Sequence, residues 1–525
     1  MAGFLIHSPL IAHAHATPQH PALSCNGETL TYHELDERSN QLAHALLASG
    51  VALEDRIGLF LHKGLDLGVA IYGVLKAGCA FVPLDPTMPV DRLALILDDC
   101  GIDTLISADA LVDTVRALPA SIAPLHVIGV DEALPFRQSN WDAIRTYPVT
   151  APDVVMIDQQ LGYIMYTSGS TGVPKGMMHT HAGSICYAEW GRNHVGLTAE
   201  DKVASHAPLH FDLSIFDFFS TLRAGGTVVL VPEAVTRFPA SWTQYIESER
   251  ISVVFTVPYT LITMVDHGAI EQRDLSSLRW LMFGGEPYAP RQLRQLMQAL
   301  PGVRLTNVYG PAEAPSCTCY DVPDPLPPGD EPLPIGTVSR NSDDLIVDEH
   351  GDDCEPGESG ELCIRSSTLT RGYWNRPDLN ARAFLLRPSH GPFPNVYYRT
   401  GDRVIRHADG LLRFLGRMDR MVKTRGHRVE LDEVESVLLS LDGVEAGAAY
   451  AVVDATDNVV IMADVLLKPD AALTEQHLFN HMQKKLPRYA VPQSMHIATS
   501  LPHTSSGKID RKTLADQRQR DITTP

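Results

Sequence analysis

YTSGSTGVPKG, residues 166–176, follows directly on the apolar run LGYIM and sets the expectations for the rest of the chain. The apolar run predicts a buried strand. The stretch after it combines three glycines, four Ser or Thr hydroxyls and a lysine, and it lacks side chains that fill a core. Such groups suit the oxygens of a phosphate chain, although Gly, Ser and Thr clusters also form plain surface turns. It is not the common P-loop, because no Gly-Lys-Ser/Thr closes a six-residue glycine spacing.

Patterns typical of strands and of helices alternate over residues 1–330. Residues 30–51, LTYHELDERSNQLAHALLASGV, predict a capped amphipathic helix that ends at Gly50. Short β-branched runs such as GTVVLVP (226–232) predict strands, and PASWTQYIESER (239–250) predicts a further helix. This alternation predicts an α/β fold with layered, mainly parallel sheets.

The pattern changes from residue 331 onward. DDLIVDEHGDDCEPGESGELCIRS (343–366) alternates short strands with Gly and Asp turns, which predicts a small antiparallel, β-barrel-like unit. A boundary near residues 417–420 leaves a C-terminal domain of roughly 100 residues with α+β patterning, which is a typical domain size. We therefore expect a large N-terminal domain, residues 1–416, and a smaller α+β C-terminal cap domain, residues 421–525.

Composition and charge narrow the functional classes. The chain has 525 residues, of which 44% are hydrophobic and 20% charged, as in ordinary globular proteins of more than one domain. The formal net charge of −20 argues against a broad surface for nucleic acid or for an anionic membrane. Eight cysteines are scattered without a zinc spacing, which favours reduced thiols. No segment is apolar enough to span a bilayer, so we expect a cytoplasmic protein.

Four motifs follow the glycine-rich loop in a fixed order. They are NVYGPAEA (307–314), YRTGDR (398–403), GRMDRMVKTRGHRVELDEVE (416–435) and SSGKIDRK (505–512). With weaker echoes elsewhere, they cover nearly the whole chain and resemble the adenylate-forming superfamily, specifically the adenylation domains of nonribosomal peptide synthetases and their free-standing relatives. The resemblance implies that ATP and Mg²⁺ serve to activate a carboxylate as its adenylate. Joining two anions in this way needs cations and N–H donors more than a covalent nucleophile.

The resemblance also assigns the nucleotide site. The glycine-rich loop is expected to bind pyrophosphate oxygens, Tyr309 to stack on adenine, and Asn307 to meet the adenine amino edge. Asp402 is expected to accept hydrogen bonds from the ribose hydroxyls, and Arg417 is expected to contact the ribose or a phosphate. The residues expected to bind ATP are Thr167, Ser168, Ser170, Thr171, Lys175, Gly285, Glu286, Asn307, Tyr309, Gly310, Asp402 and Arg417.

Two positions near the expected phosphates are of special interest. Glu313 resembles the Mg²⁺ carboxylate, a hard oxygen ligand that suits a phosphate-bound ion. Ala312 departs from the family pattern, which has a Thr whose hydroxyl reaches the α-phosphate. The loss of that donor would cost about one or two kcal/mol if nothing replaces it. Because the other motifs are intact, we do not take Ala312 as a sign of inactivity.

The C-terminal motifs carry the expected catalytic and hinge residues. The ammonium of Lys508 is expected to bridge the attacking carboxylate and the α-phosphate during adenylation. Asp419 matches the superfamily's hinge position within residues 417–420. Rotation there would withdraw Lys508 and bring the cap face around Lys423 and Gly426 to the thiol entrance. Taken alone, an exposed lysine or a turn aspartate would be ordinary surface residues.

Asp212, in HFDLSIFDFF (210–219), bears on the substrate class. In amino-acid-activating relatives the equivalent Asp pairs with the substrate ammonium, whereas the same residue could simply cap the helix that follows. By resemblance the remaining side-chain pocket carries no charge, and burial of an unpaired charge is costly, so a small neutral amino acid such as proline or alanine is expected. The expected substrate-binding residues are Asp212, Leu213, Phe216, Thr256, Met282, Gly284, Val308, Ser316 and Cys317.

The expected acceptor is a separate carrier protein. No carrier-type serine motif follows Lys508, so we expect the aminoacyl group to pass to the phosphopantetheine thiol of another chain. Two alternatives stay open. An acyl- or aryl-CoA ligase would use Asp212 only as a cap, and a non-catalytic adenylate-binding subunit would explain Ala312.

Overall fold

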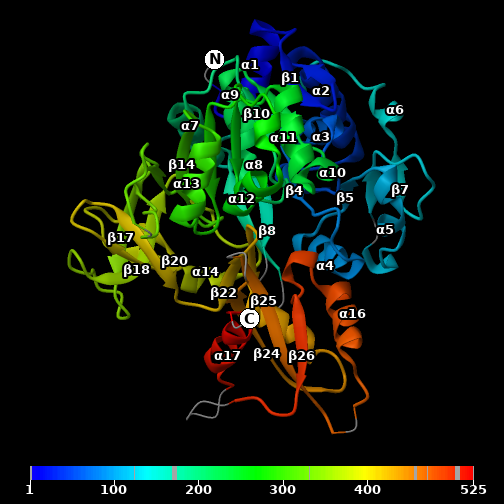
Figure 1. Ribbon diagram of the computed structural model, residues 1–525. Helices are drawn as coiled ribbons and strands as arrows, with labels where there is room; N and C mark the ends of the chain where they lie inside the picture. The colour runs from blue at the N-terminus through cyan, green and yellow to red at the C-terminus, as the bar shows by residue number, and fades with distance from the viewer. Residues whose placement is uncertain are drawn as a thin grey trace. The chain divides into compact units, whose positions relative to one another are not determined.

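A computed structural model describes residues 3–122, 125–167, 174–329, 331–454, 458–469, 471–502 and 509–523, the side chain of Thr523 excepted. The chain forms two compact units (Figure 1). Unit 1 comprises residues 1–86, 97–166 and 176–416, and unit 2 comprises residues 87–96, 167–175 and 417–525. The predicted fold class, a large α/β domain with a smaller C-terminal α+β domain, is confirmed.

A nine-stranded sheet forms the centre of unit 1. Its order is β16-β15-β14-β13-β12-β10-β11-β1-β2, and the strands from β14 to β1 run parallel. β1, near the N-terminus, thus pairs with the distant β11. The strands are β1 (Pro21–Cys25), β2 (Glu28–Thr31), β10 (Lys202–Ser205), β11 (Thr227–Leu230), β12 (Val253–Thr256), β13 (Trp280–Gly284), β14 (Arg304–Tyr309), β15 (Thr318–Asp321) and β16 (Thr337–Val338).

A seven-stranded sheet has the order β7-β6-β5-β3-β4-β8-β9, and its strands from β7 to β8 are parallel. The apolar run LGYIM lies in β8, as its pattern predicts. The strands are β3 (Arg56–Leu59), β4 (Ala80–Pro83), β5 (Thr104–Ile106), β6 (His126–Ile128), β7 (Arg137–Ser139), β8 (Leu161–Thr167) and β9 (Lys175–Thr180).

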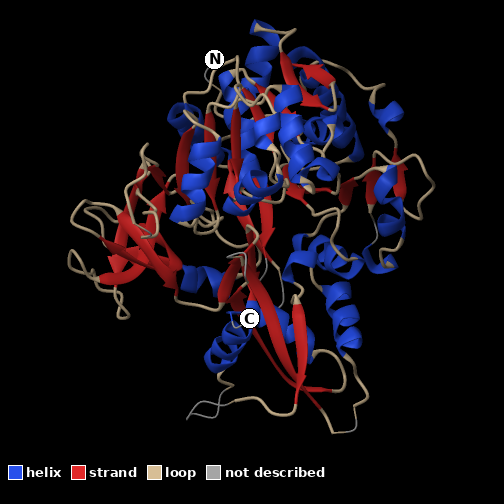
Figure 2. Ribbon diagram, in the orientation of Figure 1, coloured by secondary structure: helices blue, strands red, loops and turns tan. Residues whose placement is uncertain are grey.

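Helices alternate with these strands (Figure 2). They are α1 (Ser8–Ala16), α2 (Tyr32–Ser49), α3 (Leu65–Lys76), α4 (Val90–Cys100), α5 (Val112–Arg116), α6 (Trp141–Ile144), α7 (His181–Val195), α8 (Leu213–Ile215), α9 (Thr221–Ala224), α10 (Glu233–Thr236), α11 (Pro239–Glu249), α12 (Pro258–His267), α13 (Pro290–Ala299) and α14 (Pro377–Ala383). One π-helical turn, Phe216–Ser220, joins α8 to α9. None of the described helices has both the length and the apolar character needed to cross a bilayer.

Helix α2 shows why the sequence folds as it does locally. Thr31 accepts a hydrogen bond from the Glu34 N–H at 3.2 Å, and the Glu34 carboxylate accepts one from the Thr31 N–H at 2.8 Å. This capping box begins the helix, and Gly50, at φ +97°, ends it in the left-handed region that glycine tolerates. At the crossing with α3, Gly73 permits the close approach, because a Cβ there would lie 2.6 Å from Leu42 Cδ2.

An antiparallel sheet completes unit 1. Its path is β17-β18-β20-β19, and β21 pairs with β20, which agrees with the barrel-like pattern predicted from the sequence. Figure 2 shows few helices beside these strands. The strands are β17 (Ser342–Val347), β18 (Ser359–Ser366), β19 (Phe384–Arg387), β20 (Asn395–Arg406) and β21 (Leu412–Arg417).

The C-terminal part of unit 2 has a three-stranded sheet, β24-β25-β26, and a separate hairpin of β22 and β23. Apolar side chains of α15 and α16, including Val434, Leu438, Leu478 and Met482, pack in one buried cluster with the sheet. The elements are β22 (Met421–Thr424), β23 (His427–Glu430), α15 (Leu431–Leu439), β24 (Val444–Val453), β25 (Val459–Leu467), α16 (Glu475–Lys485), β26 (Ser494–Ala498) and α17 (Arg511–Thr523).

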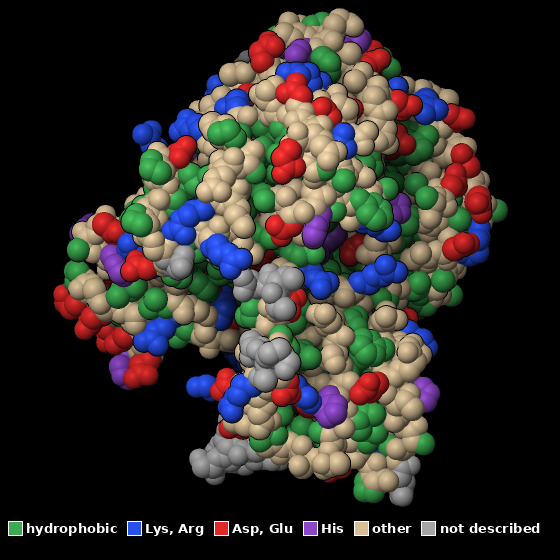
Figure 3. All heavy atoms as spheres, viewed as in Figure 1, with side chains coloured by type: hydrophobic (Ala, Val, Ile, Leu, Met, Phe, Trp, Pro, Cys, Tyr) green, Lys and Arg blue, Asp and Glu red, His purple; other side chains and the backbone are tan. Residues whose placement is uncertain are grey.

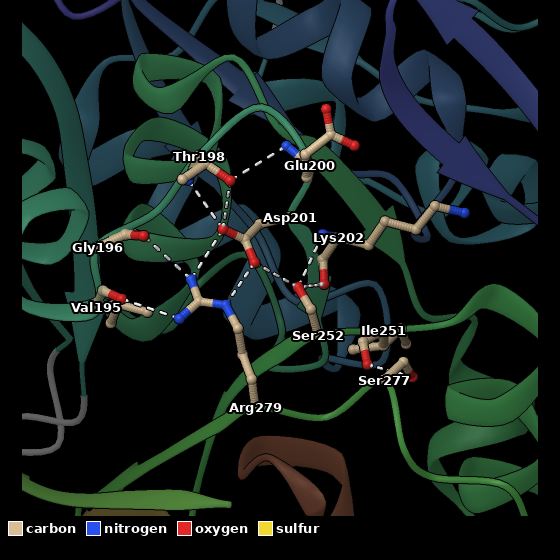
Figure 4. A network of polar contacts seen from close by, with 10 residues as sticks. All are labelled: Val195, Gly196, Thr198, Glu200, Asp201, Lys202, Ile251, Ser252, Ser277 and Arg279. Carbon is tan, nitrogen blue, oxygen red and sulfur yellow. Dashed lines mark hydrogen bonds and ion pairs between the residues drawn. The ribbon is translucent and has the colours of Figure 1, made fainter.

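A buried carboxylate fixes the amino ends of the parallel strands in the nine-stranded sheet (Figure 4). Asp201 precedes β10, Ser252 precedes β12 and Arg279 precedes β13. Arg279 donates from Nε and Nη2 to the Asp201 carboxylate at 2.7 and 2.8 Å, and Ser252 Oγ donates to it at 2.8 Å. The Thr198 N–H donates to Asp201 at 2.9 Å. Burial works to raise the pKa of Asp201, but these donors together hold it below the ordinary 3.8.

We predict that Asp201→Asn lowers the free energy of unfolding by about 2 kcal/mol at pH 7, since hydrogen bonds to a charged group contribute in this range. A depressed folded-state pKa stabilises the protein above the unfolded-state pKa, and this contribution is lost as the pH falls through the folded-state value. The difference between variant and wild type should therefore shrink as the pH falls below 3.8. Urea unfolding at several pH values measures both effects.

Glu200→Gln is the matched control, because Figure 4 shows the Glu200 carboxylate pointing away from the network. It should unfold like the wild type at every pH. An Asp201→Asn protein as stable as Glu200→Gln at pH 7 would contradict the proposed anchoring.

Candidate active site

The carboxyl ends of β12, β13 and β14 bring several predicted residues together. The register pairs Thr256 with Phe283 and Gly284 with Val308, so these strand ends lie level with one another. Asn307 and Tyr309 follow at the end of β14. Ligands of parallel α/β sheets bind outside the carboxyl ends of the strands. This edge is therefore the candidate active site, and it lies opposite the Asp201 network.

The predicted side-chain pocket is buried and uncharged. Leu213, Phe216, Met282 and Val308 belong to one buried apolar cluster. Phe216 lies in the π-helical turn and packs edge-on against Phe255, with ring centroids 5.6 Å apart. π-helical turns occur frequently at functional sites. Gly284 approaches the neighbouring strand, because a Cβ there would lie 2.3 Å from the Val308 carbonyl oxygen.

Asp212 directly precedes α8, as the sequence indicated. Its backbone is helical, at φ −60° and ψ −24°, and its side chain makes no capping hydrogen bond. The capping role considered from the sequence is therefore not seen. Burial is the largest cause that raises the pKa of the Tyr187 hydroxyl, and the charge of nearby Asp212 is the second largest. Ser316 Oγ donates to the Tyr187 hydroxyl at 3.3 Å, so Tyr187, which the sequence analysis missed, connects two predicted residues.

Two other predicted pocket residues, Ser316 and Cys317, lie against residues that are predicted to bind the nucleotide. Cys317 is buried, and its Sγ donates to the Tyr309 carbonyl at 3.6 Å. Thr256 Oγ1 lies 3.2 Å from His206 Nδ1. Gly310 has no room for a side chain, because a Cβ would lie 2.4 Å from the Ser316 N.

Tyr309 and Asp402, predicted to bind adenosine, are in direct contact. The Tyr309 hydroxyl donates to Asp402 Oδ2 at 2.5 Å, and both residues are buried. The Asn307 amide donates to the Pro334 carbonyl at 2.9 Å. Nearby, Gly285 adopts φ +92°, and Glu286 accepts a hydrogen bond from the Tyr259 N–H at 3.1 Å. A carboxylate that a buried hydroxyl holds in one orientation can accept hydrogen bonds from ribose hydroxyls.

Glu313 is fully buried and accepts a hydrogen bond from the Tyr373 hydroxyl at 2.6 Å. The Tyr373 and Tyr398 hydroxyls lie 3.3 Å apart. Burial lowers the pKa of nearby His179 to about 4, although the Glu313 charge opposes this shift, so His179 is neutral at pH 7. Sequence patterns did not predict the contact between Tyr373 and Glu313, which are 60 positions apart.

The expected phosphate loop is only partly described. Ser168, Ser170 and Thr171 lie outside the described residues. Among the described residues, the buried hydroxyl of Thr167 has no hydrogen-bond partner. In unit 2, Lys175 Nζ lies 3.5 Å from the Glu430 carboxylate, and both side chains are largely buried. A buried donor and a buried cation at the two ends of the loop suit an anionic ligand.

In unit 2, Arg417 and Asp419 form a pair. Arg417 Nε donates to Asp419 Oδ1 at 2.8 Å. Burial works to raise the pKa of Asp419, but the Arg417 guanidinium holds it below its usual value. Lys423 lies on β22, and Gly426 lies in the turn to β23, where Arg425 and Gly426 adopt φ +50° and +80°, as a two-residue I′ turn requires. Lys508 lies outside the described residues.

A cavity of about 660 Å³ lies in unit 2 beside this turn. Thr424 and Arg425 line it together with apolar and polar side chains of β25 and of residues 479–493. Among the described residues, no cluster of His, Cys, Asp and Glu could hold a metal ion by itself. On the face that Figure 3 draws, basic and acidic side chains of the described residues are interspersed, which does not favour a broad nucleic-acid surface.

Comparison with known proteins supplies independent information. Residues 10–374 match the family model described as AMP-binding enzyme, and residues 433–508 match its C-terminal domain. The chain is 33% identical over 513 residues to L-proline--[L-prolyl-carrier protein] ligase of Pseudomonas fluorescens, covering 98% of this chain and 99% of that protein. It is 34% identical over 505 residues to tyrocidine synthase 2 of Brevibacillus parabrevis, covering 95% of this chain but only 13% of that protein.

Solved structures share the fold. Amide bond synthetase McbA from Marinactinospora thermotolerans superposes with a TM-score of 0.87 at 24% identity, covering 98% of this chain and 99% of that chain. The Vibrio cholerae adenylation domain AlmE, in complex with glycyl-adenosine-5'-phosphate, superposes with a TM-score of 0.84 at 23% identity, covering 99% of this chain and 98% of that chain.

Proposed function

This chain belongs to the AMP-binding enzyme family and is an amino-acid-adenylating ligase, and on that premise we propose that its substrate is a small neutral amino acid, proline or alanine first. In the proposed reaction a carboxylate oxygen of the substrate attacks the α-phosphate of ATP, and pyrophosphate leaves. The carrier's phosphopantetheine thiol then attacks the acyl carbon, and AMP leaves. The proline-specific name of the Pseudomonas fluorescens relative supports this substrate class and a carrier-protein acceptor.

The observation that carries the proposal is the combination of Asp212 with buried, uncharged neighbours. Leu213, Phe216, Met282 and Val308 lie in one buried apolar cluster, so they would offer the substrate side chain apolar surface. The charge of Asp212 lies near the Tyr187 hydroxyl, which accepts a hydrogen bond from the predicted pocket residue Ser316, and this supports a role toward a substrate ammonium. A carboxylate beside a buried apolar pocket is suited to an α-amino group attached to a small neutral side chain.

The nucleotide would be recognised by groups that already have fixed orientations. We assign adenosine to Asn307, Tyr309 and Asp402, and the triphosphate to the loop between Thr167 and Lys175. The hydrogen bond from Tyr309 to Asp402 supports the ribose role, because it holds the carboxylate in one orientation. Donors fixed in advance need no reorganisation when negative charge moves from the α-phosphate to pyrophosphate.

The residues present fit Mg²⁺ through Glu313. Its carboxylate is a hard oxygen donor, and a Mg²⁺ ion is commonly held by one or two carboxylates together with substrate phosphates. Tyr373 holds the carboxylate by a hydrogen bond to Oε1, which supports a defined orientation toward a ligand. Bound there, Mg²⁺ would neutralise charge on the phosphates. Glu313 would hold the ion, and Tyr373 would hold Glu313.

The first test of the proposal is an ATP–pyrophosphate exchange panel. Exchange should depend on a small neutral amino acid and should be weak with the deaminated analogue. Asp212→Ala should lower kcat/KM for the amino acid by a factor that corresponds to about 3–5 kcal/mol, the range for removing one partner of a buried ion pair. The same substitution should not change kcat/KM for the deaminated analogue. Glu200→Gln is the control, because the Glu200 carboxylate points away from the Asp201 network that aligns the strands. A wild type that prefers the deaminated acid would refute the proposal in favour of an acyl ligase.

The two half-reactions should be separable by mutation. Lys508→Ala should abolish exchange while leaving transfer from a supplied aminoacyl adenylate to the carrier largely intact, because its ammonium matters while two anions are joined. Asp419→Pro, which fixes φ at the proposed hinge, should preserve exchange and impair transfer. Asp419→Ala is its control, since it breaks the same Arg417 pair without fixing φ. Unchanged exchange in Lys508→Ala would remove Lys508 from adenylation.

Glu313→Gln keeps the hydrogen bond from Tyr373 but removes the charge. We expect a higher Mg²⁺ concentration for half-maximal exchange and a lower maximal rate, because the neutral amide is a weaker ligand. Glu361→Gln is the control, because Glu361 is also buried in unit 1 and pairs with Arg399 at 2.6 Å. Identical Mg²⁺ titrations for both variants would remove Glu313 from the ion site.

A further inference from the structure

Glu435, on α15, gathers two arginines from distant parts of unit 2. Arg420 donates from Nη2 to Glu435 Oε1 at 2.7 Å and from Nη1 to Oε2 at 3.0 Å. Arg511 donates from Nε to Oε1 and from Nη2 to Oε2, both at 2.7 Å. The Ala449 N–H donates to Oε1 at 2.7 Å. The carboxylate therefore accepts hydrogen bonds from three separate segments.

This geometry indicates a rigid junction. Both arginines bind the carboxylate through two nitrogens, which is the strongest and most directional arrangement for such a pair. The Glu435 side chain is only 8% exposed. Burial works to raise its pKa, but Arg511, Arg420 and the Ala449 N–H hold it below the usual value, so Glu435 is ionised at pH 7. Without this charge, two guanidinium groups would lose their shared partner.

The two arginines connect the end of the proposed hinge to the start of α17. Arg420 is the last residue of the proposed hinge, 417–420, and directly precedes β22. Arg511 is the first residue of α17 and follows Lys508 by three positions in the sequence. Arg420 also donates from Nη2 to the Ala449 carbonyl at 2.9 Å, which adds β24 to the junction.

We propose that Glu435 is a positioning residue that joins the hinge end, β24 and the start of α17 into one body, so that α17, which begins three positions after Lys508 in the sequence, follows any rotation at the hinge. This inference rests on the proposed adenylation function. Glu435 would act through the Lys508 segment and not by contact with the reacting groups. Its loss should therefore slow adenylation without weakening the binding of ATP or amino acid.

The junction itself can be tested without any activity. Glu435→Gln keeps the side-chain shape but removes the charge, and Arg511→Lys keeps the charge but loses the two-nitrogen contact. Hydrogen–deuterium exchange of the full chain should rise together at residues 417–424 and at 511–516 in both variants. The control is Asp464→Asn, another buried carboxylate that pairs with α17, through Arg518 at 2.9 Å. Asp464→Asn should raise exchange near Arg518 without affecting residues 417–424. Exchange that rises at only one end of the junction in Glu435→Gln overturns the proposal.

The positioning role is tested by single-turnover formation of the aminoacyl adenylate, because this rate constant does not depend on the fraction of folded enzyme. Glu435→Gln should lower it by roughly tenfold or more, as small displacements of reacting groups do, with KM values near those of wild type. A wild-type rate constant in Glu435→Gln, or a loss that appears only as a raised KM, overturns the role. If the wild type forms no aminoacyl adenylate, the proposed function fails and the positioning role fails with it. The hydrogen–deuterium exchange experiment still decides whether Glu435 joins the three segments.

Discussion

The site depends first on the alignment of parallel strands in the nine-stranded sheet. Asp201 binds Arg279, Ser252 and Thr198 at the amino ends of β10, β12 and β13, so these strands begin in a fixed register. Because parallel strands of similar length that begin level also end level, the fixed register carries Thr256 and Gly284 to a common edge, where Gly284 pairs with Val308 of β14. The polar network thus acts at one edge of the sheet, and the candidate site lies at the other.

Charged and polar side chains that are predicted to bind the substrates are held by neighbours within their own unit. Tyr309 orients Asp402, and Tyr373 orients Glu313. In unit 2, Lys175 faces Glu430 and Arg417 binds Asp419. Fixed partners reduce the reorganisation that binding and reaction require, which is an important source of catalysis for reactions that move charge between phosphate oxygens. If the triphosphate binds Lys175 as proposed, it competes with Glu430 for this ammonium group.

The sequence predicted features that depend on local pattern. The strand–helix alternation, the α2 capping box and the antiparallel change after residue 331 are encoded by neighbouring residues, and the structure agrees with them. Thr256, Gly284 and Val308, which the resemblance assigns to one pocket, lie at neighbouring strand ends. Asp212 was ambiguous, because a residue before a helix has the pattern of a cap whether or not its side chain forms the hydrogen bond.

Contacts between distant residues could not be predicted in this way. Tyr373 is 60 positions from Glu313, and Arg511 is 76 positions from Glu435. No periodicity connects such pairs, because packing of separate segments brings them together. Residues 87–96 and 167–175 belong to unit 2 although they interrupt unit 1 in the sequence, and local sequence patterns did not predict this either.

The central claim is that a substrate carboxylate oxygen attacks the α-phosphate of ATP. The most direct measurement follows an ¹⁸O label from the carboxylate of the amino acid, with hydroxylamine as the acceptor, and determines by mass spectrometry where the label goes. The account predicts aminoacyl hydroxamate, pyrophosphate and AMP that carries one labelled oxygen. Label in inorganic phosphate, with ADP as the other product, would show attack at the γ-phosphate and would contradict the account.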